Sequence, residues 1–331
     1  METIKDLKVN LESKILSSKN VIIVPHSRID FDSFASAVGI SLIVEKLQKQ
    51  SMILVDDPIY NFDSSVKSVI DNARKHFNII NKEKYNKLKD KDDLVIFTDV
   101  NKSNLVCIKD QLDEIDLENR FIIDHHDKGM QTIESNYQYI NTNASSVTEI
   151  IVKLLNTFKI KYSAEVANYL LAGIYLDTNK LTKNTSPDTF KIVARLMENG
   201  ASNSVIDKWF AEDFESDKRV FELVSKAIIF KYSYAIVMAD ETQEYTREEL
   251  AKVSDHLLKY GVDAAFAIGN VDENLISISA RSKERVNVGE IMNEFDGGGN
   301  RYSAATKLTD DSIEEVGKRL IKLIEPPYII K

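Results

Sequence analysis

The sequence predicts an α/β fold, with an N-terminal parallel sheet flanked by helices and a smaller C-terminal α/β domain. In the first part of the chain, short apolar runs of strand length alternate with longer segments of helical spacing. Such alternation is typical of parallel strands joined by right-handed helical crossovers. Polar side chains follow several of these runs directly. With 331 residues, the chain is long enough for two domains, each with its own core.

The first domain is expected over residues 1–190. Its strands are predicted at 21–24, 52–55, 94–97 and 121–123, each a continuous apolar run of the kind found in buried parallel strands. Helices are predicted at 1–16, 37–47, 107–117, 147–158 and 164–176, with helix and loop over 60–90. A helical connector is expected over 191–226.

The second domain is expected over residues 227–331. It begins with a strand-like run at 227–239, followed by a helix at 246–260 that opens with a capping-box pattern. Two strands at 264–271 and 275–281, a short helix at 288–295 and a last helix at 312–324 complete the prediction. Between the last two helices lies Gly297-Gly298-Gly299-Asn300. Glycines let a backbone approach a phosphate closely, although a flexible turn explains a glycine run equally well by itself.

Composition limits the function classes. Hydrophobic residues make up 43% and charged residues 29%, as in a globular protein. The net charge of −9 provides no field to attract nucleic acid, so we expect no binding of long duplexes. A single cysteine, Cys107, excludes a disulfide scaffold and favours a cytoplasmic protein. No apolar run approaches the roughly 20 residues of a membrane span, so no membrane contact is expected.

Titratable residues cluster after the predicted strands. In parallel sheets, ligands bind beyond the carboxyl ends of the strands. Although a His pair after a core strand is also compatible with an ordinary surface position, convergence from several strands favours a site. The residues are His26, Asp30 and Asp32 after the first strand, Asp99 after the third, and Asp124, His125 and His126 after the fourth. Asp177 ends an apolar helix, where the helix dipole disfavours an acid and a cation would explain it.

Carboxylates and imidazoles without thiolates suit Mn²⁺, Mg²⁺, Fe²⁺ or Zn²⁺. The set holds more acids than one ion needs, which favours two ions sharing a carboxylate. Such a pair activates a water molecule and stabilises an in-line displacement at phosphorus. Neither a Walker A sequence nor a G-x-S-x-G motif is present, so neither an ATPase nor a serine hydrolase is expected.

These motifs resemble those of the DHH phosphoesterase superfamily. Asp124-His125-His126 is similar to the motif that names it, and the segments around His26, Asp99 and Asp177 resemble its other motifs in order. The run Gly297–Asn300 resembles the GGGH motif of the DHH-associated C-terminal domain. Three further segments, at 144–146, 171–174 and 278–282, resemble the catalytic part of bacterial cyclic-di-AMP phosphodiesterases, here in a stand-alone form.

The resemblance implies roles for individual residues. One ion would be held by His26, Asp30 and Asp99, and the other by Asp32, Asp99, His125 and Asp177, with Mn²⁺ the expected metal. His126 would face the substrate phosphate, and Asp124 would orient the His pair. Ser145, Ser146, Arg281, Gly298, Gly299 and Asn300 would bind substrate. Asn300 and Asn184 stand where relatives carry His and often Arg, so positive charge near the substrate is lower.

By the same resemblance, the expected activity is hydrolysis of cyclic di-AMP to linear pApA. One alternative is a nanoRNase that degrades very short RNA and also dephosphorylates 3′-phosphoadenosine 5′-phosphate. An inorganic pyrophosphatase is less favoured because its C-terminal domain lacks the glycine motif. A nucleotide-binding sensor without turnover is the non-enzymatic alternative. A homodimer is a further expectation.

Overall fold

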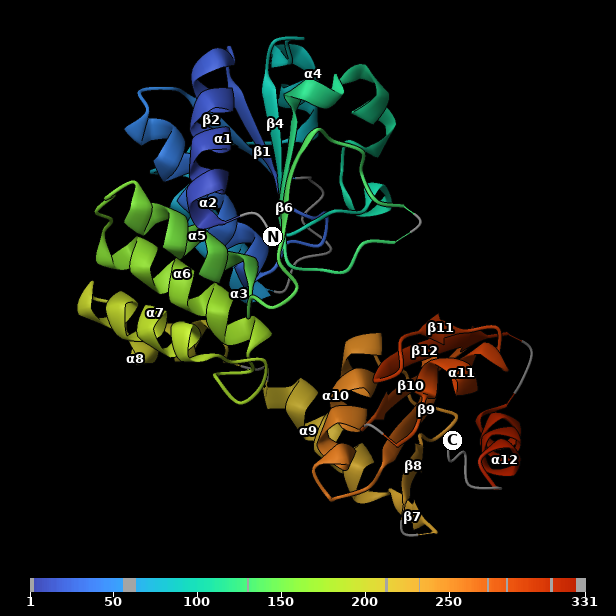
Figure 1. Ribbon diagram of the computed structural model, residues 1–331. Coiled ribbons are helices and arrows are strands. Elements are labelled where there is room, and N and C mark those ends of the chain that lie inside the picture. Colours follow the sequence, from blue (N-terminus) through green and yellow to red (C-terminus); the bar gives the residue numbers. More distant parts are fainter. Residues whose placement is uncertain are drawn as a thin grey trace. The chain divides into compact units, whose positions relative to one another are not determined.

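The chain divides into two compact units, Met1–Ala211 and Glu212–Lys331, each built around a six-stranded sheet (Figure 1). The computed structural model describes residues 3–55, 64–129, 131–211, 214–231, 233–272, 274–283, 285–309 and 312–325. The residues expected to form a connector, 191–226, are divided between the units: they include the end of one helix and a short second helix in the first unit, and a further helix in the second.

The first sheet is parallel throughout, with strand order β3-β2-β1-β4-β5-β6. Alternate residues of its strands enter two separate cores: Ile23, Ile96 and Ile123 one, Ile22 and Ile122 the other. A sheet that is apolar on both faces explains the continuous apolar runs in the sequence. The strands are β1 Val21–Val24, β2 Ser51–Leu54, β3 Ile79–Ile80, β4 Leu94–Thr98, β5 Arg120–Asp124 and β6 Tyr137–Ile140.

Helices cover this sheet, and their starts are fixed by side-chain caps. Asp30 caps α2 in a capping box with Ser33, Ser146 caps α5, and Ser163 caps α6. Helix α2 packs against both α5 and α6 beside the sheet (Figure 1). The helices are α1 Ile4–Ser17, α2 Phe31–Lys46, α3 Ser64–Ala73, α4 Lys82–Leu88, α5 Val147–Thr157, α6 Ala164–Asp177, α7 Pro187–Glu198 and α8 Asn203–Trp209.

The prediction of one helix over 107–117 is wrong. Short 3₁₀ segments occupy this region: η2 Ser103–Leu105, η3 Lys109–Glu114 and η4 Leu117–Asn119. The buried guanidinium of Arg120 donates to the carbonyls of Leu112, Ile115 and Glu134. Because the carbonyl of Leu112 would accept a backbone hydrogen bond in an α-helix over 107–117, its bond to Arg120 favours the short turns. Strands β3 and β6 were not predicted, since one has only two residues and the other is largely polar.

The second sheet has the order β11-β12-β10-β9-β8-β7 and is antiparallel except for the β8–β9 pair. The strand-like run at 227–239 is in fact two antiparallel strands, and β12 was not predicted. The elements are α9 Phe214–Ser225, β7 Ile228–Phe230, β8 Tyr234–Met238, α10 Arg247–Leu258, β9 Ala264–Asp272, β10 Leu275–Ser282, α11 Val288–Asn293, β11 Gly298–Gly299, β12 Ser303–Leu308 and α12 Ile313–Leu323.

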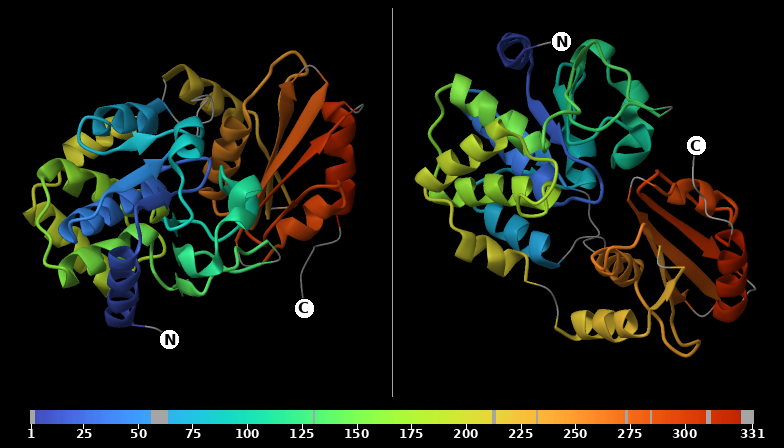
Figure 2. Two further views of the ribbon diagram at one scale, coloured as in Figure 1. Left: turned by 90° about the horizontal axis from the view of Figure 1, so that it is seen from above. Right: turned by 60° about the horizontal axis from the view of Figure 1, so that its bottom comes forward.

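Helices α10 and α12 lie on opposite sides of this second sheet (Figure 2). The predicted capping box of α10 is present between Thr246 and Glu249. Within the described ranges, no helix has the length and apolar character needed to cross a membrane.

Candidate metal centre

The carboxyl ends of β1, β4 and β5 bring the predicted metal ligands together. They form three overlapping groups, in each of which one candidate ligand atom per residue lies within 4.8 Å of the others. The groups are His26–Asp30–Asp99, Asp32–His125–Asp177 and Asp99–His125–His126. Asp177 comes from a different element, the last turn of α6. All six residues predicted as ligands therefore occur in these groups.

The first group is held by the start of α2. Asp30 accepts a hydrogen bond from the Ser33 backbone N–H through Oδ1, at 2.9 Å, as the helix cap. Its Oδ2 lies 3.3 Å from His26 Nε2, and Asp99 Oδ2 lies 3.5 Å from the same nitrogen. The cap thus leaves one oxygen of Asp30 directed at its neighbours.

The second group depends on the start of α5. Both oxygens of Asp32 accept backbone N–H groups there, from Val147 and Thr148, each at 2.8 Å. His125 Nε2 lies 3.1 Å from Asp177 Oδ2 and 3.8 Å from Asp99 Oδ1. On the other side of the ring, Nδ1 lies 3.3 Å from the Ala144 carbonyl oxygen, which can only accept. This contact assigns a proton to Nδ1, which leaves Nε2 as the nitrogen that would bind a metal once it has lost its own proton.

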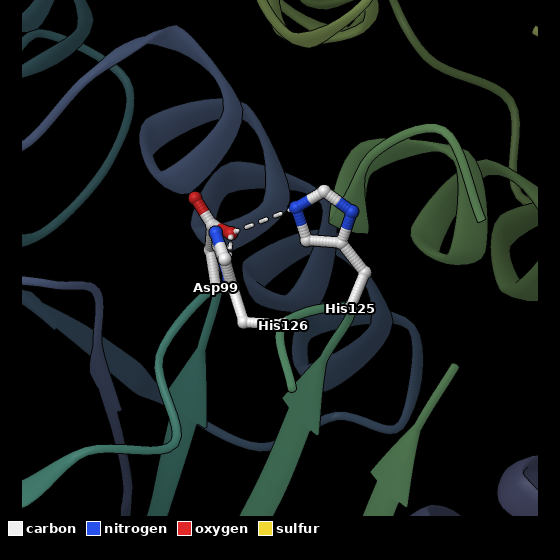
Figure 3. A group of neighbouring side chains, drawn as sticks. All are labelled: Asp99, His125 and His126. Carbon is white, nitrogen blue, oxygen red and sulfur yellow. Dashed lines mark ion pairs between the residues drawn. The ribbon is translucent and has the colours of Figure 1, made fainter. Parts of the chain in front are cut away.

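The two imidazoles of the His pair point in different directions (Figure 3). Their rings meet edge to face, with centroids 4.4 Å apart. His126 Nδ1 lies 2.9 Å from Asp124 Oδ1 and 3.6 Å from Asp99 Oδ1, while 56% of its side chain is exposed. Asp124 is fully buried, and its Oδ1 also accepts the backbone N–H groups of His125 and His126. Asp124 therefore fixes both the loop and the His126 ring.

The centre contains buried polar atoms without hydrogen-bond partners. Among the described residues these include Asp99 Oδ1, Asp124 Oδ2 and His125 Nε2. Leaving a buried polar group unsatisfied costs about 1–3 kcal/mol. Two of these atoms, Asp99 Oδ1 and His125 Nε2, are candidate ligand atoms 3.8 Å apart, so a cation would satisfy both. The nitrogen and oxygen donors fit divalent metals such as Mn²⁺, Mg²⁺ and Zn²⁺.

Burial and crowding alter the acid–base properties of these groups. Burial, followed by the charge of Asp177, raises the pKa of Asp32 to about 7. Burial and the charge of Asp32 raise the pKa of Asp99 well above its ordinary value. For His26 and His125, burial opposes the charged form, but the neighbouring carboxylates outweigh it and raise each pKa to about 10. The metal-free centre thus holds protons that a bound cation would replace.

We expect metal binding at pH 8 to release at least about two protons, because His26 and His125, with pKa values of about 10, must become neutral to bind. Apparent metal affinity should rise with pH up to about 10. The metal-free fold should lose stability over the same range, since a raised imidazole pKa favours the fold only below it and most fully below ~6.5. Calorimetry in buffers of different ionisation heat measures the release; a value near zero at pH 8 would contradict this assignment.

The His pair provides a second prediction. His126→Ala should retain its metal but show a rate about 10²-fold lower, because removing one stabilising interaction with the reacting phosphate costs ~3 kcal/mol. His125→Ala should lose metal, because its Nε2 faces two candidate ligands. Metal content and turnover are measured together, with the exposed His76, outside these groups, replaced by Ala as the control. Equal metal loss in both variants would show that His126 is also a ligand, as its proximity to Asp99 allows.

A supporting network behind the ligands was not predicted from the sequence. Buried Glu149 accepts hydrogen bonds from Ser145 at 2.6 Å, Lys153 at 2.7 Å and Thr189 at 2.7 Å. Ser146 accepts from the Glu149 backbone N–H. The segment that carries the Ala144 carbonyl is thereby fixed against α5 and α7. The spacing of Ser146 and Glu149, typical of a helix start, was the available signal.

The hydroxyls of Ser145 and Ser146 are thus both used within the fold, and the residues are 3% and 0% exposed. Their contact with substrate stays a prediction.

The other predicted substrate residues belong to the second unit. Arg281 donates through Nε to Asp255 Oδ1 and through Nη1 to the Ala280 carbonyl, each at 3.1 Å. Asn300 Oδ1 accepts from the backbone N–H groups of Tyr302 and Ser303, at 2.8 and 2.9 Å. The Asn300 side chain therefore closes the turn between β11 and β12, which leaves its amide nitrogen as the group for a ligand.

The three glycines differ in what the fold requires. A Cβ at Gly297 would lie 2.6 Å from the Ala305 carbonyl oxygen, and one at Gly299 would lie 2.4 Å from Ala304 Cα. Gly299 also has φ +147°, which disfavours other residues. At Gly298, nothing lies within 4 Å of the added atom. Packing therefore explains two of the glycines but not Gly298.

With this geometry in place, comparison with known proteins identifies the family. The DHH family N-terminal domain matches residues 20–174, and the DHHA1 domain matches residues 230–325. The chain is a DHH-family protein. The DHH match ends three residues before Asp177, so this candidate ligand lies just beyond it.

Curated relatives of this DHH-family chain include the cyclic-di-AMP phosphodiesterase GdpP of Bacillus subtilis, 31% identical over 325 residues, and the cyclic-di-AMP phosphodiesterase PdeA of Listeria monocytogenes, 30% identical over 327 residues. Each alignment covers 95% of this chain and 49% of the relative, so the chain spans about half their length. Among solved structures, an exopolyphosphatase-related protein from Bacteroides fragilis shares the fold, with TM-score 0.78, 18% identity and 98% coverage of both chains.

Proposed function

We propose that this protein is a metal-dependent phosphodiesterase that hydrolyses cyclic di-AMP to linear pApA. The observation that carries the proposal is the convergence of three carboxylate–imidazole groups around buried Asp99. Two bound divalent ions, Mn²⁺ in our proposal, would supply an activated water and neutralise charge at phosphorus. His26 and Asp30 would hold one ion, and Asp32, His125 and Asp177 the other, with Asp99 between them.

Residues outside the ligand groups support this chemistry in the proposal. Asp124 engages Nδ1 of His126, so in the protonated ring the other nitrogen, Nε2, would donate a hydrogen bond to a phosphate oxygen. In the second unit, Nη2 of Arg281 forms no hydrogen bond within the described part of the chain, and Gly298 offers uncovered backbone. Both can bind phosphate, and the amide nitrogen of Asn300 can donate to a base or phosphate.

The relatives support cyclic di-AMP as the substrate, because both GdpP and PdeA are cyclic-di-AMP phosphodiesterases. The alternative is a nanoRNase acting on pApA and other very short RNA, and on 3′-phosphoadenosine 5′-phosphate. The same metal centre would serve both reactions, since each cleaves a phosphate ester by attack of water. A hollow in the second unit lined by Arg247 and Lys307 favours linear oligonucleotides as additional ligands.

A direct test compares turnover of cyclic di-AMP and pApA by the Mn²⁺-loaded protein, with metal content measured in the same samples. We expect two ions per chain, conversion of cyclic di-AMP to pApA, and loss of activity with a chelator. Binding of either nucleotide without turnover by the fully loaded protein would instead support the sensor and refute the phosphodiesterase. Faster cleavage of pApA than of cyclic di-AMP would favour the nanoRNase.

A further inference from the structure

A hollow of about 330 Å³ lies on the second sheet, beside the glycine strand β11. Its lining includes Arg247, Ser277, Gly298, Ala305 and Lys307. Arg247 is the first residue of α10, Ser277 lies on β10, and Ala305 and Lys307 lie on β12. The hollow therefore joins one helix start to three adjacent strands. Apart from Gly298, none of these residues belongs to the predicted site.

The charges of the hollow indicate an anionic ligand. Arg247 and Lys307 are both exposed, and neither forms an ion pair with a carboxylate in the described part of the chain. Asp296 also lines the hollow but is in no such pair. A positive charge in the first turn of a helix is repelled by the helix dipole, so the charge of Arg247 does not stabilise the fold through that dipole. An anion between Arg247 and Lys307 would offset both the dipole and the repulsion of the two cations.

Gly298 provides an independent indication. A glycine within a strand destabilises the fold by roughly 0.5–1 kcal/mol relative to Ala. Neither a close neighbour nor a positive φ requires glycine at this position. The missing side chain does leave the backbone open on the side of the hollow. Close approach of a ligand explains why a glycine is present here.

The hollow shares a face of the sheet with Arg281. Side chains alternate along a strand, so Ser277, Ser279 and Arg281 of β10 point to the same side. Ser279 is 4% exposed, its Oγ has no partner, and Ala305 of the hollow lies directly opposite it. From Ser277 to Arg281 the strand advances four residues, roughly 13 Å at ~3.3 Å per residue. Beside these buried serines, Ala305 and Lys307 of β12 are exposed, so one extended ligand lying along β12 can contact both ends of this face.

We propose that Arg247 and Lys307 bind one phosphate of a linear oligonucleotide while Arg281 holds another phosphate further along the same chain. The ligands of this hollow are then short linear oligonucleotides of three or more nucleotides. The proposal rests on the proposed phosphodiesterase function. A linear chain can extend along the face, whereas a cyclic dinucleotide closes both of its phosphates into one ring. The hollow should therefore contribute to binding of linear chains and not of cyclic di-AMP.

The test measures binding of 5′-phosphorylated oligoadenylates of two to five nucleotides, and of cyclic di-AMP, to the full chain in chelator, where no turnover occurs. The variants are Arg247→Ala, Lys307→Ala and the double variant. Lys318→Ala on α12, which is exposed and paired with Glu314, is the control with the same change in charge. Arg247→Lys tests whether charge alone suffices.

We expect the double variant to bind trimers and longer chains at least tenfold more weakly, with unchanged binding of cyclic di-AMP. The slope of log affinity against log salt concentration should become shallower by about 0.7 for each phosphate that is no longer neutralised. Unchanged affinity for the longer chains, or an equal loss for cyclic di-AMP, overturns the inference. Failure of the proposed function would appear separately, as absence of turnover by the Mn²⁺-loaded wild type on every one of these nucleotides.

Discussion

Asp99→Asn is expected to abolish hydrolysis and lower metal content while the fold survives. Asp99 contributes to two of the three ligand groups, and its Oδ1 is buried without a hydrogen-bond partner. An amide removes the negative charge that both groups share. The rate should fall by more than about 100-fold, the upper range for residues that only support a metal ligand. Metal analysis, turnover and thermal unfolding of the same preparation check all three parts.

Asn is the appropriate replacement because of the backbone at this position. Asp99 has φ +58°, in the left-handed region that Asn and Asp tolerate better than most residues. Ala would combine loss of the ligand with backbone strain. The metal-free variant should be at least as stable as the metal-free wild type, because burial and the nearby charge of Asp32 disfavour ionised Asp99.

Asp93→Asn provides a matched control at the opposite end of the same strand. Asp93 precedes β4, is 3% exposed, and accepts hydrogen bonds from Asn20 and the Asp90 backbone. Its replacement should cost some stability and leave metal binding intact. If Asp99→Asn keeps most of its Mn²⁺-dependent activity, Asp99 does not join the two ions.

The fold of the first unit was largely predictable because the strands of a fully covered parallel sheet are continuous apolar runs. In the second unit, two strand assignments could not be made from such runs. The alternation of buried Ala304 and Thr306 with exposed Ala305 and Lys307 identifies β12 only once it pairs with β10. Likewise, the run at 227–239 has no sequence break strong enough to separate β7 from β8, yet the chain reverses at Lys231, with φ +51°.

The grouping of the candidate ligands was also predictable, because the carboxyl ends of parallel strands meet at one edge. Their supports were not. Asp32 is fixed by the start of α5, a helix that begins 115 residues later in the chain. Glu149 accepts a hydrogen bond from Ser145, although in the sequence it is only an acidic residue in the first turn of a helix, where acids are common. Such contacts depend on how helices pack against each other, and no local pattern in one sequence specifies that packing.

Gly173→Ala should disrupt the centre from a residue that touches no metal. In α6, Gly173 lies one turn before Asp177 and faces the start of α2. A Cβ there would lie 2.5 Å from Thr148 Oγ1 and 3.1 Å from both Asp32 Cα and the Phe31 carbonyl oxygen. Two of these neighbours are backbone atoms of the segment that carries a ligand, so α6 and α2 must separate. Because Asp177 and Asp32 lie on the two separating helices, their group should widen.

We therefore expect Gly173→Ala to lose metal from the Asp32–His125–Asp177 group and to lose roughly 100-fold in activity, comparable to the loss of a support to a metal ligand. Overpacking should also cost about 1–3 kcal/mol of unfolding free energy. Thermal unfolding, metal stoichiometry and turnover are measured on each preparation. Adding Thr148→Ala to Gly173→Ala removes the nearest obstructing atom but leaves the two backbone contacts. The double variant should therefore regain part of the lost unfolding free energy while its metal content stays low.

Gly39→Ala is the matched control, since it overpacks α2 against α5 away from the ligands. Its Cβ would lie 2.3 Å from Ile151 Cγ2, a side-chain atom that can move, and no ligand is among its nearest neighbours. This variant should lose stability but keep two ions per chain. Equal metal loss in both glycine variants would mean that metal binding follows global stability. Full metal content in Gly173→Ala would show that the spacing of α2 and α6 does not set the distance between Asp32 and Asp177.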